Sequence, residues 1–165
     1  YVVDIGYTQE NGTVILGILN VCNCVGRIIL GYFGDQIGHV NMLTMTMVTM
    51  VLSVCGVWPF CTNLPALVAF SCLYGLSTGG YISTIPVVVA KLYGTEKIAT
   101  VIGWLFTSSG CGLLFGAPIA GAILDATRPH LTYIPIMEYG GATLMIAAAA
   151  LIVMRVNKGL KWERV

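Results

Sequence analysis

Residues 20–41, NVCNCVGRIILGYFGDQIGHVN, decide the fold of this chain. The stretch begins inside a long apolar run, carries a charged side chain at Arg27, and leaves the apolar pattern at Gly34 and Asp35. An ion in hydrocarbon costs at least a few kcal/mol, so an arginine inside such a run needs a physical reason. We therefore expect a membrane helix in which Arg27 has a structural or functional role, followed by a short polar turn.

The composition around this stretch is typical of a protein embedded in lipid. Of the 165 residues, 57% are hydrophobic and 9% are charged, whereas a soluble domain carries about a quarter charged residues. The mean hydropathy is +0.87, and a soluble fold this apolar would expose large aggregating patches. The net charge of +1 offers no basic surface, so no nucleic-acid partner is expected. We infer a multi-pass integral protein of the plasma membrane or an organelle membrane, with the lipid bilayer as its surroundings.

Five apolar runs, each bounded by charged or turn residues, predict an all-α fold with five transmembrane helices. The expected spans are 12–33, 42–60, 64–90, 98–124 and 135–155, followed by a tail at 156–165. Runs of about 20 residues cross about 30 Å of hydrocarbon at 1.5 Å per residue. Alternating strand patterns, which a β-barrel would need, are absent from the sequence. Because the links are short, we expect one bundle of antiparallel neighbours.

The positions of the lysines and arginines predict the orientation of the bundle. If the links after the first, third and fifth spans face the cytoplasm, that side holds Lys91, Lys97, Arg155, Lys158, Lys161 and Arg164. The other side keeps Arg128, so the positive-inside rule predicts a cytoplasmic C-terminus. The opening residues, YVVDIGYTQE, contain no methionine and no basic leader. We therefore expect the chain to be part of a longer protein.

The sequence offers no pattern for catalysis, a metal or a cofactor, and we do not expect an enzyme. The six cysteines include no CxxC pair and are expected to be small apolar fillers of membrane helices. No HExxH motif, nucleophile–base pair or cluster of carboxylates falls at membrane depth, and His130 is expected in an outer turn.

Two predicted helices combine rows of small residues with an internal proline. The third span contains Gly75, Gly79, Gly80 and Pro86, and the fourth contains Gly112, Gly116, Pro118 and Gly121. Small residues four apart let helix backbones approach closely, and an internal proline frees a carbonyl and kinks the helix. Tight packing alone explains any one of these glycines. Two such helices in one bundle favour a protein that changes shape, as transporters do.

The first span carries a polar stripe. Asn20, Asn23, Arg27 and Gly31 lie on one helical face, which lipid would reject. This face is expected to turn toward the bundle interior or a water-filled cavity; the alternative is that Arg27 snorkels to the headgroups. Its guanidinium could bind a carboxylate bidentately, and no acidic residue lies at membrane depth in this span. Arg27, Asn23 and Asn20 are therefore the candidate substrate-binding residues.

Gly31, Asp35 and Gly38 follow a G-x-x-x-D-x-x-G spacing at the end of this span. We expect Asp35 just beyond the helix end, where its carboxylate could fasten a neighbouring helix by its N-terminus or a basic side chain. A solvated loop aspartate is the alternative.

The segment GYFGDQIG at residues 31–38 resembles the loop signature of the major facilitator superfamily, in the copy that joins the second and third helices of the C-terminal half. With Asn23, LYGLSTGG and GAPIAGAILDAT, the whole chain resembles a fungal-type member of the monocarboxylate porter family. The resemblance implies that the five spans form most of the C-terminal six-helix half of a twelve-helix fold. The missing partner would be the N-terminal half of the same transporter.

The resemblance further implies a secondary-active symporter that moves a small organic anion, a monocarboxylate, with a proton by rocking of two halves. Arg27 matches the family's intramembrane arginine, which contacts the substrate carboxylate. Animal members have an aspartate four residues before that arginine, where this chain has Asn23, so the coupling ion stays open. Gln36 and His39 stand where the superfamily usually has basic residues, and His39 is expected to be a loop residue rather than a proton relay.

A non-transporting membrane sensor or assembly subunit built on the same scaffold is the alternative function. Alternating access needs two halves around a midplane site, so we expect this chain alone to be unstable or inactive.

Overall fold

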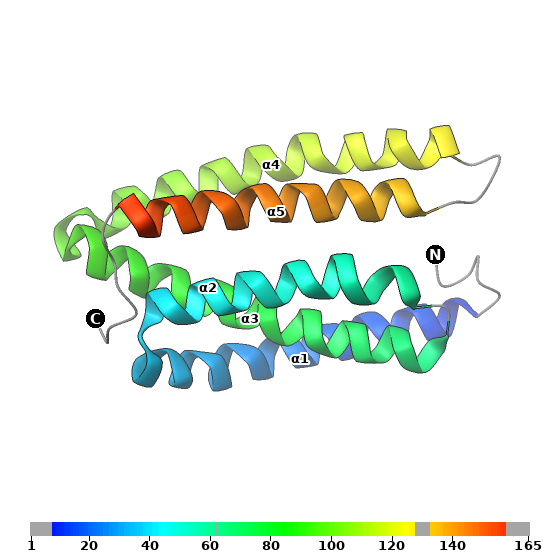
Figure 1. Cartoon of the computed structure of the whole chain (residues 1–165), viewed down its shortest axis with the longest axis horizontal. Coiled ribbons are helices and arrows are strands. Elements are labelled where there is room, and N and C mark those ends of the chain that lie inside the picture. The colour runs from blue at the N-terminus through cyan, green and yellow to red at the C-terminus, as the bar shows by residue number, and fades with distance from the viewer. Residues whose placement is uncertain (1–7, 62, 128–132, 158–165) are drawn as a thin grey trace.

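The computed structural model describes residues 8–61, 63–127 and 133–157, and the predicted all-α membrane fold is confirmed (Figure 1). Five helices are long and apolar enough to cross a membrane, and the described residues include no strand. The helices are α1 (Gln9–Ile37), α2 (His39–Leu52), α3 (Leu64–Tyr93), α4 (Ile98–Thr127) and α5 (Ile134–Asn157).

Three short segments of non-α helix complete the chain path. After Leu52, α2 continues as a π turn, η1 (Ser53–Val57), and then as a tighter 3-10 turn, η2 (Trp58–Phe60), with Pro59 near its start. The second membrane crossing therefore runs from His39 to Phe60. A further 3-10 turn, η3 (Thr95–Lys97), joins α3 to α4.

The link between α1 and α2 is shorter than the sequence predicts. Helix α1 runs to Ile37, so Asp35 lies in its last turn rather than beyond its end. Gly38 alone separates α1 from α2, with a φ of 100°, a conformation that glycine adopts without the penalty of a Cβ. Helix α1 continues through the polar residues before Gly38 and ends at Gly38, whose backbone conformation is not helical.

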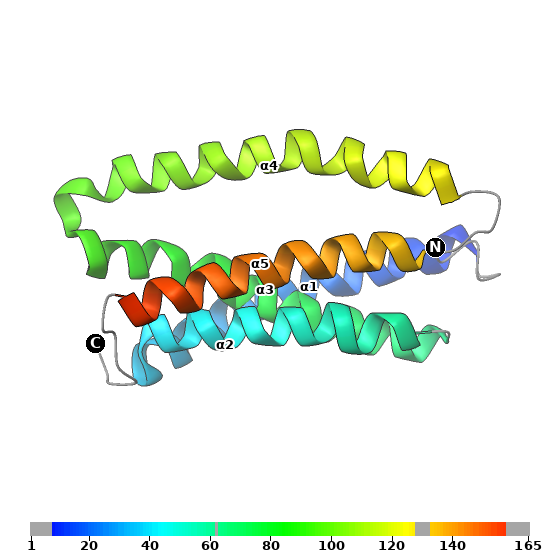
Figure 2. The same ribbon diagram turned by 45° about the horizontal axis from the view of Figure 1, so that its top comes forward.

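Consecutive helices run antiparallel, so that α1, α3 and α5 point the same way, and the helices differ in how deeply they pack (Figures 1 and 2). α1 makes its most extensive contact with α3, while α2 lies against α3 and α5. α4 lies at the outer edge in both views and touches α3 and α5 only sparsely. No residue of its most apolar stretch is buried within the described structure, and Trp104, Phe106 and Phe115 are exposed.

The best-buried helix is α2. One side of it is a row of methionines and leucine, consisting of Met42, Leu43, Met47 and Met50, each at most 6% exposed. At the opposite end of the bundle, Ile15, Cys61 and Leu67 form a small apolar cluster between α1 and the start of α3. The core therefore lies among α1, α2 and α3, which is where the candidate site is found.

Candidate functional site

Glycines bring the backbones of α1 and α3 into direct contact. A Cβ added at Gly75 would lie 2.6 Å from the Leu19 carbonyl oxygen, and one at Gly79 would lie 2.9 Å from the Arg27 backbone nitrogen. Real Cβ atoms do not tolerate such distances. From the other side, Gly26 of α1 meets the backbone of Leu76. The glycine row on α3 thus forms a close helix–helix contact of the small-xxx-small type.

Arg27 is held by its own helix at this contact. Its Nε donates a hydrogen bond to Asn23 Oδ1, one turn earlier, at 3.1 Å. The backbone of the same turn rests on Gly79, so the α1–α3 contact determines where this turn lies. Because its Nε is bound to Asn23, the guanidinium keeps its two terminal nitrogens for another acceptor.

The structure brings Asn23 and Arg27 together but leaves Asn20 apart. Asn20 donates its side-chain N–H to the Leu16 carbonyl at 3.0 Å, which satisfies one donor within the helix. Gly31 lies farther along α1, where an added Cβ would be 3.8 Å from Ser83 Oγ of α3. Sequence reasoning missed Ser83 as a neighbour of the stripe, since one hydroxyl in an apolar run carries no distinctive pattern.

The side chain of Arg27 is exposed within this chain. Among the residues that the structure describes, no carboxylate forms an ion pair with it. A cation on a membrane-spanning helix requires compensation from a ligand, another protein surface or water. The geometry therefore presents an oriented guanidinium that can receive an anion.

At the α1–α2 link, Asp35 pairs with the first residue of α2. His39 Nε2 lies 3.1 Å from Asp35 Oδ1, so the carboxylate joins the two helices across Gly38. The interpretation of His39 as a loop residue is wrong, because it begins α2 and is only 7% exposed. It lies over Gly34, which leaves room for its ring.

A second polar contact fastens the same end of the bundle and was not foreseen from the sequence. Arg155, in the last turn of α5, donates to Asn41 Oδ1 and, at 3.1 Å, to Thr44 Oγ1 of α2. Arg155 is 8% exposed and Asn41 is 4% exposed. Nothing in the local sequence pairs residues more than a hundred positions apart, and the sequence indicates Arg155 only as a basic residue that sets the orientation of the bundle.

The other residues predicted to allow a conformational change are prolines and glycines of α3 and α4. Pro86 lies inside α3 and Pro118 inside α4. A Cβ at Gly116 or Gly112 would meet nothing within 4 Å, so α4 presents its glycines without a described partner. The glycine rows of α3 and α4 therefore differ: one is filled by α1, and the other is open within the described chain.

These features define a class, the multi-pass helical membrane proteins with a cationic helix face beside a glycine-mediated helix contact. The sequence-family model of the Major Facilitator Superfamily matches residues 2–163 of this chain. The chain therefore belongs to that superfamily.

Relatives that match nearly the whole length of this chain are named as transporters. The riboflavin transporter MCH5 of Saccharomyces cerevisiae is 31% identical over 167 residues, which cover 99% of this chain and 32% of the yeast protein. Monocarboxylate transporter 12 of Mus musculus is 26% identical over 168 residues, covering 100% of this chain and 34% of the mouse protein. An MFS-type transporter of Gibberella moniliformis is 25% identical over 163 residues, covering 98% and 39%. The chain thus spans about a third of the length of these relatives.

Proposed function

We propose that this chain is part of a secondary-active transporter that moves a small organic anion, a monocarboxylate, by alternating access. The observation that carries the proposal is the guanidinium of Arg27, oriented by Asn23 and paired with no carboxylate in the described chain. A planar guanidinium binds a carboxylate with two parallel hydrogen bonds and keeps its charge at every physiological pH. The transporter names of the relatives support the same class.

The proposal includes a second half that this chain does not contain. Relatives are about three times longer than the chain, and alternating access requires two bundles around a central site. The exposed polar face of α1 would then line the space between the halves. The positive-inside rule supports placing the end that carries Lys91 and Arg155 on the cytoplasmic side.

A second substrate class has its own support. The yeast relative is named a riboflavin transporter, and riboflavin has no carboxylate. Asn23 and Arg27 could serve such a substrate as hydrogen-bond donors without charge pairing. A monocarboxylate substrate needs the guanidinium for charge pairing, whereas a riboflavin-like substrate needs only hydrogen-bond donors at this position.

Uptake into vesicles that contain the complete protein tests both classes. Labelled monocarboxylates and labelled riboflavin are compared for the wild type, Arg27→Lys and Arg27→Ala, with Lys97→Ala as a control at an exposed cation. We expect Arg27→Ala to abolish monocarboxylate uptake, Arg27→Lys to reduce it at least tenfold, and the control to match the wild type. Equal uptake by wild type and Arg27→Ala would refute the assignment of Arg27.

The Asn23→Asp variant tests the coupling ion. A carboxylate at this position would lie next to the Arg27 guanidinium, because Asn23 Oδ1 is already 3.1 Å from its Nε. It would compete with an anionic substrate until it is protonated, so we expect monocarboxylate uptake to become dependent on low pH in this variant. A variant with wild-type uptake at every pH would contradict this arrangement. Binding without uptake by the wild type would instead favour a sensor on the same scaffold.

A further inference from the structure

Two cysteines meet across the close contact between α1 and α3. Cys22 lies at this contact, because a Cβ added at Gly75 would be 3.1 Å from the Cys22 Cβ. Cys72 lies one turn before Gly75 on the same face of α3, since residues three apart share a helical face. The side chains of Cys22 and Cys72 interact directly. The two residues are far apart in the sequence, so the packing of α1 on α3 is what makes them a pair.

The glycine contact places this pair within bridging range. Two cysteines can form a disulfide only when their Cα atoms lie within about 7 Å of each other. At Gly75 the helices are in backbone contact, because an added Cβ would lie 2.6 Å from the Leu19 carbonyl oxygen. Side chains of a helix lean toward its N-terminus, and α1 and α3 point the same way. The thiol of Cys22 therefore leans from the level of Gly75 toward that of Cys72.

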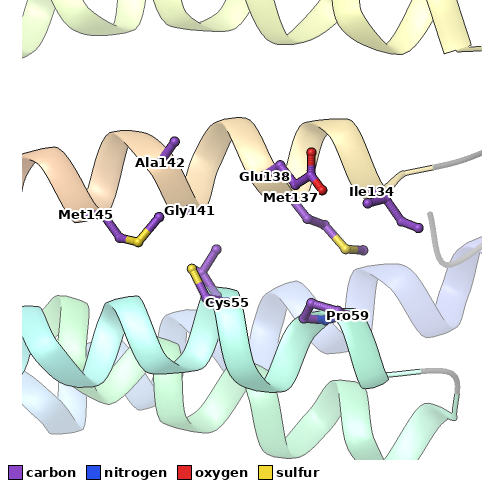
Figure 3. Close-up of a pocket in the computed structure, with 9 residues that line it drawn as sticks. Cys55, Pro59, Ile134, Met137, Glu138, Gly141, Ala142 and Met145 are labelled. Carbon is purple, nitrogen blue, oxygen red and sulfur yellow. The ribbon is translucent and has the colours of Figure 1, made fainter.

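Cys55, in η1, has a different neighbourhood. It points toward Gly141 of α5 across a groove (Figure 3), and a Cβ added at Gly141 would lie 2.7 Å from its Sγ. Met137 and Met145 add thioether sulfur to the same groove, and Cys55 is the one cysteine among the described residues that line it. A thioether is oxidised to a sulfoxide and forms no disulfide. The contact between α1 and α3 therefore differs from this groove in that both of its sulfur atoms are thiols.

We propose that Cys22 and Cys72 are an oxidisable thiol pair, which a hydroperoxide converts into a disulfide that fastens α1 to α3. Both residues are half-buried, whereas Cys61 is buried in the apolar cluster. The hydroperoxide is hydrogen peroxide from water or a peroxidised acyl chain from the lipid, and the two share the reactive O–O bond. The pair is a modification site whichever substrate the protein carries.

The chemistry needs two thiols and one hydroperoxide. One thiol loses its proton, and its sulfur attacks an oxygen of the O–O bond. An S–O bond forms, the O–O bond breaks, and water or an alcohol leaves with that proton, which gives a sulfenic acid. The second sulfur then attacks the first, so that the S–S bond forms and the S–O bond breaks with loss of water. Two electrons pass from the sulfur atoms to the hydroperoxide. Because the partners are already in place, the second step outpaces further oxidation of the sulfenic acid.

The disulfide would act on the candidate site through the backbone. Cys22 directly precedes Asn23, whose Oδ1 accepts the hydrogen bond from Arg27 Nε. A covalent link at Cys22 would hold this turn of α1 against α3, and a reductant would release it.

Peptide mapping of the complete protein in lipid vesicles tests the proposal without any measurement of transport. The protein is reduced, freed of reductant, and treated with hydrogen peroxide or with cumene hydroperoxide, which partitions into lipid. Remaining thiols are blocked, and disulfide-linked peptides are identified by mass spectrometry without reduction. We expect at least one oxidant to raise the peptide that links Cys22 to Cys72 at least tenfold above the untreated sample. The more effective oxidant shows whether the pair is reached from water or from lipid.

Variants provide the specificity control. Cys24→Ala removes an exposed thiol two residues from Cys22 and should leave the linked peptide unchanged, whereas Cys72→Ala should abolish it. Oxidation should also raise the unfolding temperature of the wild type and of Cys24→Ala, and leave that of Cys72→Ala unchanged. The absence of the linked peptide with both oxidants, its loss in Cys24→Ala, or a mixture of links in which Cys22 and Cys72 do not predominate would overturn the proposal. A linked protein with an unchanged unfolding temperature would refute the fastening of α1 to α3.

Discussion

Substitution of Gly79 by alanine tests the close contact on which the candidate site depends. An added methyl group at this position would lie 2.9 Å from the Arg27 backbone nitrogen, and it would also meet the backbone of Asn23. Backbone atoms cannot rotate away as a flexible side chain can, so α1 and α3 must separate. Overpacking of this kind costs about 1–3 kcal/mol.

A matched substitution on α1 separates the cost of overpacking from the gain in helix propensity that alanine brings. Gly17→Ala adds the same methyl group where nothing lies within 4 Å. Alanine is favoured over glycine inside a helix by up to about 1 kcal/mol, and both variants receive this gain. Relative to Gly17→Ala, we therefore expect Gly79→Ala to be less stable by about 1–3 kcal/mol, which is the overpacking cost alone.

Thermal unfolding of the complete protein in detergent, followed by tryptophan fluorescence, measures this difference. Gly79→Ala should unfold at a lower temperature than the wild type or at nearly the same temperature, and always below Gly17→Ala. Monocarboxylate uptake should fall as well, because the turn that carries Arg27 is displaced. If Gly79→Ala and Gly17→Ala unfolded at the same temperature, the close contact between α1 and α3 would be refuted.

Two further substitutions test the end of the bundle where α2 contacts both α1 and α5. Arg155→Met removes the donors to Asn41 and Thr44, so we expect the free energy of unfolding to fall by about 1–3 kcal/mol. Arg155→Lys should restore part of this loss. An Arg155→Met variant as stable as the wild type would contradict the contact. Gly38→Ala places a Cβ at a φ of 100°, so we expect a loss of about 1–3 kcal/mol. Gly140→Ala, with nothing within 4 Å, should show no loss in the same assay, and equal stability of the two glycine variants would argue against a strained link.

The membrane fold was predictable because apolar runs of sufficient length have few alternatives. The sequence also predicted the α3 glycine row, which α1 fills at Gly75 and Gly79. The end of α1 was not placed correctly, since Asp35 and its polar neighbours resemble a loop in composition. A helix continues through polar residues as long as its backbone geometry is allowed, and Gly38 alone departs from it.

The candidate site was predictable only where its residues lie on one helix. A 3.6-residue repeat places Asn23 beside Arg27, and the hydrogen bond between them follows. The same repeat could not show that Asn20 would bond to its own backbone. Contacts between distant helices, such as Arg155 with Asn41, depend on tertiary packing. The π turn at Ser53–Val57 has no reliable sequence signal.

The pairing of α1 with α3 has a consequence for the synthesis of this protein. α1 enters the membrane before its main partner exists, because all of α2 and half of α3 must still be translated. At about 5–20 residues per second, this interval lasts several seconds. During that time Arg27 must be tolerated by the insertion machinery or by water drawn into the bilayer. The contact between α1 and α3 can form once Gly79 has been translated and inserted. The speed of translation between the two helices therefore becomes a determinant of the yield of folded protein.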